Sequence, residues 1–145
     1  MNVRRMAGAA ALATVMLWPL GAAQAQNLDL TRAHKVVFQV SDGDPARWNL
    51  ALNNARNVQA DRGRDKVAIE IVAYGPGIGM LKIDSPVAAR VADALAGGVS
   101  VVACENTMTN QKLVRDDMLP RIGYVTAGVT QLMQRQREGF AYIRP

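Results

Sequence analysis

Residues Val99–Met108 read VSVVACENTM, an apolar run that ends in the only cysteine of the chain and continues into polar residues. A short run rich in valine, preceded by Gly97 and Gly98, predicts a buried strand over residues 99–103. The polar residues after it predict a turn and then a short helix. The stretch therefore predicts that Cys104 lies at the carboxyl end of a buried strand, on the rim of a sheet.

Similar strands and helices alternate on both sides of this stretch. The alternation at short spacing predicts a three-layer α/β/α fold around a mostly parallel sheet of about five strands. We expect a flavodoxin-like topology, in which the loop 41–44 would lie beside Cys104. The strands are expected at 35–40, 66–73, 99–103, 122–125 and 140–143, and the helices at 47–60, from Ser85 to 97, 107–114 and 126–137.

The first 25 residues have the pattern of a secretory signal peptide. Arg4 and Arg5 form a basic leader, residues 6–23 carry no charge, and Ala23-Gln24-Ala25 is a small-x-small cleavage site. We therefore expect residues 1–25 to be removed, residues 26–145 to form a single domain, and the protein to be periplasmic. An uncleaved membrane anchor is the alternative. After cleavage we expect no stable membrane insertion.

The charge of the chain is mildly basic. Cleavage after Ala25 would remove two of the 17 basic residues and none of the 12 acidic ones, so the formal net charge would fall from +5 to +3. Nucleic-acid binding usually requires a clustered basic face, and the basic residues here are scattered. We therefore expect no nucleic-acid partner.

A single cysteine in an exported protein is either buried and inert, or exposed and used, because no intramolecular disulfide can form. Two features bear on Cys104. The amides of the following helix would favour its thiolate, whereas Glu105 and Asp42 or Asp44 would oppose that effect if they lie close. Free cysteines are also among the most buried residues. Position alone leaves both readings open.

Other chemistries fit the sequence less well. The only histidine, His34, precedes the first strand and should lie at the opposite end of the sheet from Cys104, which disfavours a cysteine–histidine pair. One cysteine, one histidine and scattered carboxylates give no metal-ligand spacing. The loop 75–79 lacks the Gly-Lys-Ser/Thr ending of a phosphate-binding loop. We expect no metal and no cofactor.

The assembled pattern resembles the DsrE/DsrF-like sulfur-relay family, in its exported single-domain form. The resemblance spans roughly residues 35–145. Its motifs are the Gly-Pro-Gly loop at 75–77, the run 103–108 (ACENTM), Leu119-Pro120, and the run 125–129 (VTAGV). It implies an α/β/α fold, assembly into trimers or hexamers, and a cysteine that accepts sulfur as a persulfide and passes it to a partner protein. Cys104 is the residue that matches that cysteine.

Two functions from different classes follow. In the first, Cys104 is a sulfur binder or carrier, and the candidate binding residues around it are Glu105, Asn106, Thr107, Tyr74, Gly75, Ser41 and Asp42. The amides of residues 105–107 would stabilise an anionic sulfur, and Tyr74 would form one wall. In the second, the protein is a non-enzymatic oligomeric module that binds a ligand or partner, and Cys104 is only packed. A weaker third idea is an oligomer linked through Cys104 pairs.

Overall fold

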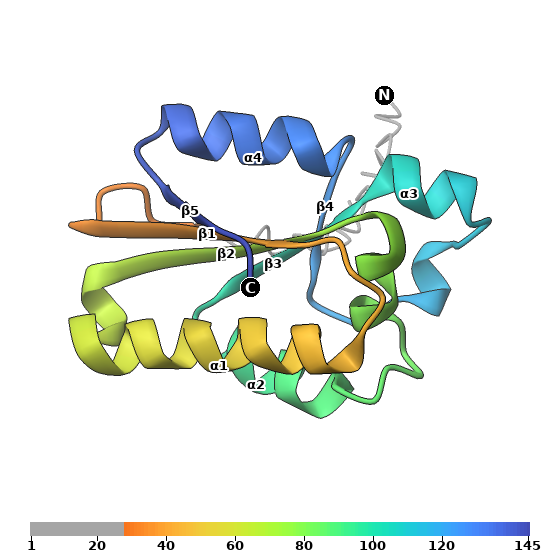
Figure 1. Ribbon diagram of the computed structural model, residues 1–145, viewed down its shortest axis with the longest axis horizontal. Helices are drawn as coiled ribbons and strands as arrows, with labels where there is room; N and C mark the ends of the chain where they lie inside the picture. Colours follow the sequence, from red (N-terminus) through yellow and green to blue (C-terminus); the bar gives the residue numbers. More distant parts are fainter. Residues whose placement is uncertain (1–27) are drawn as a thin grey trace, which may run out of the picture.

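Five strands form one sheet in which every neighbouring pair is parallel (Figure 1). The computed structural model describes residues 28–145, so the signal peptide predicted at 1–25 lies outside the described residues. The α/β fold with helices on both faces of a parallel sheet is confirmed. The strands are β1 (His34–Val40), β2 (Val67–Ala73), β3 (Ser100–Cys104), β4 (Gly123–Val125) and β5 (Ala141–Ile143).

The strand order is β4-β3-β2-β1-β5. This order differs from the flavodoxin order of 2-1-3-4-5 that we expected. In the observed sheet β2 pairs with both β1 and β3, so the loop after β2, and not the loop 41–44 after β1, is the neighbour of Cys104. The difference arises because hydrophobic periodicity identifies strands but does not specify which strands pair.

Helices cover both faces of the sheet. Figure 1 shows α1 and α2 below it and α4 above it, with α3 beyond the carboxyl end of β3. The α-helices are α1 (Pro45–Arg62), α2 (Ala88–Ala96), α3 (Glu105–Asn110) and α4 (Gly128–Arg137), and the 3-10 helices are η1 (Arg64–Lys66), η2 (Gly75–Leu81) and η3 (Arg115–Asp117).

Local capping chemistry differs among the helix starts. Asp44 caps α1, because its carboxylate accepts from the Ala46 N–H at 2.8 Å. Ser85 does not cap α2; it bonds the Val87 N–H within a turn that precedes the helix. The helix expected at 107–114 is α3, which begins two residues earlier, at Glu105, and its cap is Cys104.

The alternation of side chains along the strands produces two separate cores. Phe38, Ile69 and Val101 belong to the larger core, which α1 and α2 cover. Val37, Val72 and Leu132 belong to the smaller core under α4. The apolar segment 118–124 contributes Met118 and Ile122 to the larger core.

A buried ion pair fastens α4 to the sheet. Glu70, in the middle of β2, is 1% exposed and accepts two hydrogen bonds of 2.9 Å from Arg135. Gln131 and Ser100 donate to the same carboxylate at 2.7 and 3.2 Å. Burial acts against the charge of Arg135, but the hydrogen bonds to Glu70 and Glu138 outweigh it and raise the pKa of Arg135 above its usual value. Arg135, in the last turn of α4, therefore has a structural role: it attaches this helix to the sheet.

Candidate functional site

Cys104 is the last residue of β3 and the N-cap of α3. Its sulfur accepts the backbone N–H of Thr107 at 3.5 Å, the contact that a serine or aspartate oxygen makes at other helix starts. The residue is 4% exposed, and its Sγ lies 3.8 Å from the carbonyl oxygen of Thr126. The thiol is therefore held at the rim of the sheet by backbone groups from two segments.

The second segment is the turn between β4 and α4. Gly128, the first residue of α4, directs its backbone N–H at the Cys104 sulfur. Burial acts to raise the pKa of the thiol, but the Thr107 hydroxyl and the N–H groups of Thr107, Gly128 and Asn106 more than compensate, and the pKa lies below its ordinary value of 9.0. The thiolate is thus stabilised at the N-termini of two helices, where one had been expected.

Thr107 connects the thiol to the loop after β2. Its side-chain oxygen accepts the Gly75 N–H at 2.9 Å, and its hydroxyl also faces the sulfur. Gln111, one turn further along, donates to the Gly75 carbonyl at 3.2 Å. Both polar groups of Gly75 are therefore paired with residues that follow Cys104, and the structure brings Cys104, Thr107 and Gly75 into one network.

Tyr74 packs against the start of α4. A Cβ added to Gly128 would lie 2.9 Å from the Cβ and Cδ1 of Tyr74, so the absence of a side chain at Gly128 allows this approach. Burial raises the pKa of Tyr74 above its ordinary value of 10.0, so its phenol is neutral at physiological pH. The structure thus places Tyr74 against the residue whose N–H faces the sulfur.

Glu105 and Asn106 lie on the solvent side of the thiol. Glu105 forms an ion pair of 3.2 Å with Arg115, and the Arg115 guanidinium stacks 4.2 Å from the ring centre of Tyr124. The Asn106 N–H also donates to Thr126 O at 3.1 Å, while the residue itself is exposed. Pairing with Arg115 offsets the negative charge of Glu105 beside the thiol.

Ser41 and Asp42 belong to a neighbouring cluster at the ends of β1 and β5. Ser41 accepts a hydrogen bond of 2.9 Å from Gln39, and Asp42 lies 3.4 Å from Arg144. A Cβ added to Gly75 would lie 3.9 Å from the Ser41 carbonyl oxygen. The loop after β2 is therefore the link between this cluster and Cys104, as the strand order requires.

His34 begins β1 and Cys104 ends β3, so the two residues lie at opposite edges of the parallel sheet. Within residues 28–145, no group of three or more potential ligands from histidine, cysteine and carboxylates could hold a metal ion. In the same range, no helix combines the length and apolar character that a membrane span requires.

The sequence did not lead us to residues 126–128, which bring backbone groups to the Cys104 sulfur. The sequence does contain a signal for this contact. Gly128 follows the short strand β4, and the carboxyl ends of parallel strands share one edge of the sheet. What the sequence does not give is that β4 pairs with β3, in a register that sets Cys104 opposite Val125. That pairing brings the turn after β4 to the sulfur.

The fold and the site define a parallel α/β domain with a buried, hydrogen-bonded thiol at the carboxyl edge of its sheet. Residues 34–145 match the DsrE/DsrF-like family, and the chain belongs to that family. No curated protein matches the chain.

Two solved structures are similar to the chain. A protein of unknown function from Methanobacterium thermoautotrophicum is 38% identical, with a TM-score of 0.74 over 77% of this chain and 99% of that one. A conserved protein of unknown function from Bacteroides thetaiotaomicron is 19% identical, with a TM-score of 0.63 over 77% of this chain and 94% of that one. The second likeness concerns the fold alone.

Proposed function

We propose that this protein binds or carries sulfane sulfur on Cys104 outside the cytoplasm. The observation that carries the proposal is the position of the Cys104 sulfur between the first residues of α3 and α4, where N–H groups favour its anionic form. Membership of the DsrE/DsrF-like family supports it. The leader at residues 1–25 supports the location, because its composition is that of a signal peptide.

The proposed step is a thiolate attack. The Cys104 thiolate attacks the outer sulfur of a persulfide donor R–S–SH, a new S–S bond forms on Cys104, and the S–S bond of the donor breaks. The donor leaves as the thiolate RS⁻, and the proton of the donor's outer sulfur stays with the new persulfide. The N–H groups of Thr107 and Gly128 stabilise the anionic sulfur before the attack.

Mass spectrometry tests this proposal directly. The purified protein is incubated with a low-molecular-weight persulfide donor, and the intact mass is compared with that of the Cys104→Ser variant. We expect a gain of one sulfur atom in the wild type, reversed by a thiol reductant, and no gain in the variant. An unchanged wild-type mass, or an equal gain in Cys104→Ser, would contradict the proposal.

A second function is favoured by one observation. Cys104 is only 4% exposed, as expected for a packed residue in a non-enzymatic binding module. Alkylation of the native protein separates the two functions. Rapid modification by iodoacetamide near neutral pH supports the sulfur carrier, and protection until the protein is unfolded supports the binding module.

Assembly into trimers or hexamers, and exchange of sulfur with a donor or acceptor protein, form part of the same proposal, since the family resemblance implies them. Light scattering on the purified protein tests the assembly. A monomer at micromolar concentration would contradict it without affecting the chemistry of Cys104.

A further inference from the structure

Cys104 lies between two side chains at the carboxyl edge of the sheet. In the register of the parallel strands, Ala103 pairs with Ala73, so Tyr74, the residue after β2, lies beside Cys104. On the other side, Cys104 pairs directly with Val125 of β4. Neighbouring strands are about 4.8 Å apart. The thiol is therefore flanked by Tyr74 and Val125.

The alternation of side chains directs all three residues to the face that α4 covers. Val102, two residues before Cys104, and Val72, two residues before Tyr74, both belong to the smaller core under α4. Tyr74 and Val125 pack against the same core. The Cys104 sulfur therefore occupies a slot on this face, with the Tyr74 ring as one wall and the Val125 side chain as the other.

Small groups contact the sulfur at the ends of this slot. The Thr107 N–H donates to the sulfur at 3.5 Å from α3, and the Gly128 N–H faces it from α4. The carbonyl oxygen of Thr126 is 3.8 Å away. Backbone groups of this kind leave little room for change in the size of the slot. Among the groups around the sulfur, the Tyr74 ring is the bulkiest.

The Tyr74 ring is held at both of its ends. A Cβ added to Gly128 would lie 2.9 Å from the Cβ and Cδ1 of Tyr74, so the base of the ring is packed tightly against the start of α4. At the other end, the phenol is hydrogen-bonded to Ser41, whose hydroxyl accepts from Gln39 at 2.9 Å. A ring held in this way is a fixed wall of the slot.

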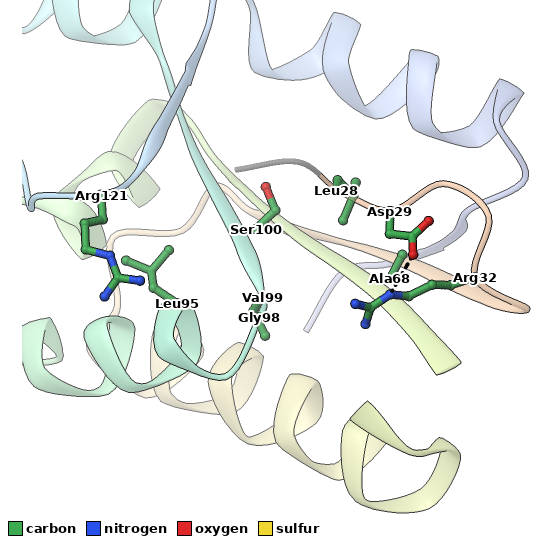
Figure 2. A pocket seen from close by; sticks show the side chains of 9 residues that line it. All are labelled: Leu28, Asp29, Arg32, Ala68, Leu95, Gly98, Val99, Ser100 and Arg121. Atoms are coloured by element: carbon green, nitrogen blue, oxygen red, sulfur yellow. Dashed lines mark ion pairs between the residues drawn. The ribbon is translucent and has the colours of Figure 1, made fainter. Parts of the chain in front are cut away.

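The amino-terminal edge of the sheet gives no second route to the thiol. Figure 2 shows the cavity of about 190 Å³ at that edge, where Ser100 lies at the start of β3. Ser100 and Cys104 are the two ends of β3, which places them about 13 Å apart at the rise of an extended strand. A reagent for the sulfur must therefore enter at the carboxyl edge, past Tyr74.

We infer that the Tyr74 ring selects the sulfur donors that reach Cys104 by their width. Among donors R–S–SH, the site takes those in which R is hydrogen or an unbranched alkyl group and excludes those in which R is branched. When the thiolate attacks the outer sulfur, the S–S bond of the donor points away from Cys104, so R must pass between the walls of the slot. This inference rests on the proposed function, because it specifies the donor for that reaction.

Alkylation measures the width of the slot without any sulfur transfer. The rates of iodoacetamide and of N-tert-butyl iodoacetamide are measured on the native protein, and each is divided by the rate with N-acetylcysteine. Both reagents meet the same thiolate, so the ratio of the two rates is independent of the thiol pKa. We expect the wild type to favour iodoacetamide by about tenfold or more, because a fixed wall rejects added bulk.

Variants of Tyr74 identify the wall. Tyr74→Leu keeps an apolar side chain on the smaller core but removes the ring, so it should lower the preference for iodoacetamide by about tenfold. Tyr74→Phe keeps the ring and should retain most of the preference. Tyr142→Leu, the same change on β5, should leave the preference as in the wild type. Urea denaturation shows that each variant is folded.

Methyl persulfide and tert-butyl persulfide repeat the comparison with sulfur donors, with the gain of one sulfur atom followed by mass spectrometry. We expect the methyl donor to react faster in the wild type, and the difference to shrink in Tyr74→Leu. No preference in the wild type, or the same preference in Tyr74→Leu, would overturn the inference. Sulfur gain at equal rates from both donors would overturn it and leave the proposed function intact. Size-selective alkylation without any sulfur gain would support the slot and contradict the proposed function.

Discussion

The backbone N–H of Gly75 donates a hydrogen bond of 2.9 Å to the side-chain oxygen of Thr107, whose own hydroxyl and N–H face the sulfur of Cys104. Because a lone pair of the oxygen is occupied by Gly75, the hydroxyl hydrogen is free to point at the sulfur. A loop from β2 thus orients a donor to a thiol on β3.

The first prediction concerns Thr107. Thr107→Val preserves the shape of the side chain and removes the hydroxyl, so the pKa of the Cys104 thiol should rise toward 9.0, its ordinary value. At neutral pH the rate of alkylation should fall by roughly threefold to tenfold, the effect of one lost hydrogen bond. The measurement is the iodoacetamide rate as a function of pH.

Two further variants control this experiment. Thr107→Ser keeps the hydroxyl and should restore most of the rate, and Thr109→Val, at an exposed position of the same helix, should leave it unchanged. An identical pH profile in Thr107→Val and wild type would show that the hydroxyl does not act on the sulfur.

The lowered pKa of Cys104 also predicts a pH dependence of stability. The folded-state pKa lies below that of the unfolded chain, near 9.0, so the stabilisation is fully present above the unfolded value and is lost as the pH falls through the folded value. The difference in unfolding free energy between wild type and Cys104→Ser should therefore grow from neutral pH to about pH 9 and then level off. Urea denaturation at several pH values measures it. A difference that shrinks over this range would contradict the assignment.

Gly128 should not tolerate a side chain. In Gly128→Ala the new Cβ would lie 2.9 Å from Tyr74 atoms, closer than side-chain atoms normally approach. We expect a loss of about 1–3 kcal/mol in stability from overpacking and a slower reaction of Cys104, because the N–H of residue 128 moves away from the sulfur. Denaturation and alkylation rates test both effects. Adding Tyr74→Ala should recover part of the stability, since the ring is one of the groups that clash.

In the loop after β2, Gly77 leaves less room for a side chain than Gly79 does. A Cβ there would lie 2.2 Å from the carbonyl oxygen of Val40, a backbone atom that cannot move aside. Gly77→Ala should therefore cost more than about 3 kcal/mol or abolish folding. The matched change is Gly79→Ala, whose Cβ would meet the Trp48 ring at 3.1 Å, and which should cost less because a ring can shift. Equal stabilities of the two variants would refute this ranking.

Removing one partner of the Glu70–Arg135 pair should lower the free energy of unfolding more than replacing both partners with apolar residues. Arg135→Met leaves a carboxylate that is 1% exposed without its charge partner, at an expected cost of about 3–5 kcal/mol. The double variant Glu70→Leu with Arg135→Met should cost less than the sum of the single variants. Chemical denaturation measures all three, with Arg137→Met as the exposed control. Strictly additive costs would show that the two residues are not coupled.

The sequence predicts the elements of this fold better than their arrangement. Valine-rich runs and helical periodicity locate β1, β2 and β3 to within a residue or two, because burial imposes those patterns locally. The strand order is set by contacts between distant segments, and the expected flavodoxin order was wrong for that reason. Glu70 stands in the middle of an apolar strand, a visible signal of a buried ion pair, but its partner lies 65 residues away on α4.

The candidate site shows the same difference between local features, which the sequence predicts, and contacts between distant segments, which it does not. Residues adjacent to Cys104 in the chain, such as Thr107, could be named from the sequence because they share its helix. The turn that contains Gly128 could not be named from the sequence, because its approach to the Cys104 sulfur depends on the pairing of β4 with β3. Asp42 was named on the expectation that β1 would lie nearer to Cys104, and in the structure its ion pair is with Arg144.

The Cys104 sulfur is both the group that would react and the cap of α3. A bond made to that sulfur alters the acceptor on which the first turn of the helix depends, so the free energy of this turn and the chemical state of the thiol are linked. Because the linkage is reciprocal, a protein that bound α3 would alter the affinity of the Cys104 thiol for a bound sulfur atom. If Cys104 carries sulfur as proposed, the stability of the first turn of α3 would therefore change with the state of the thiol.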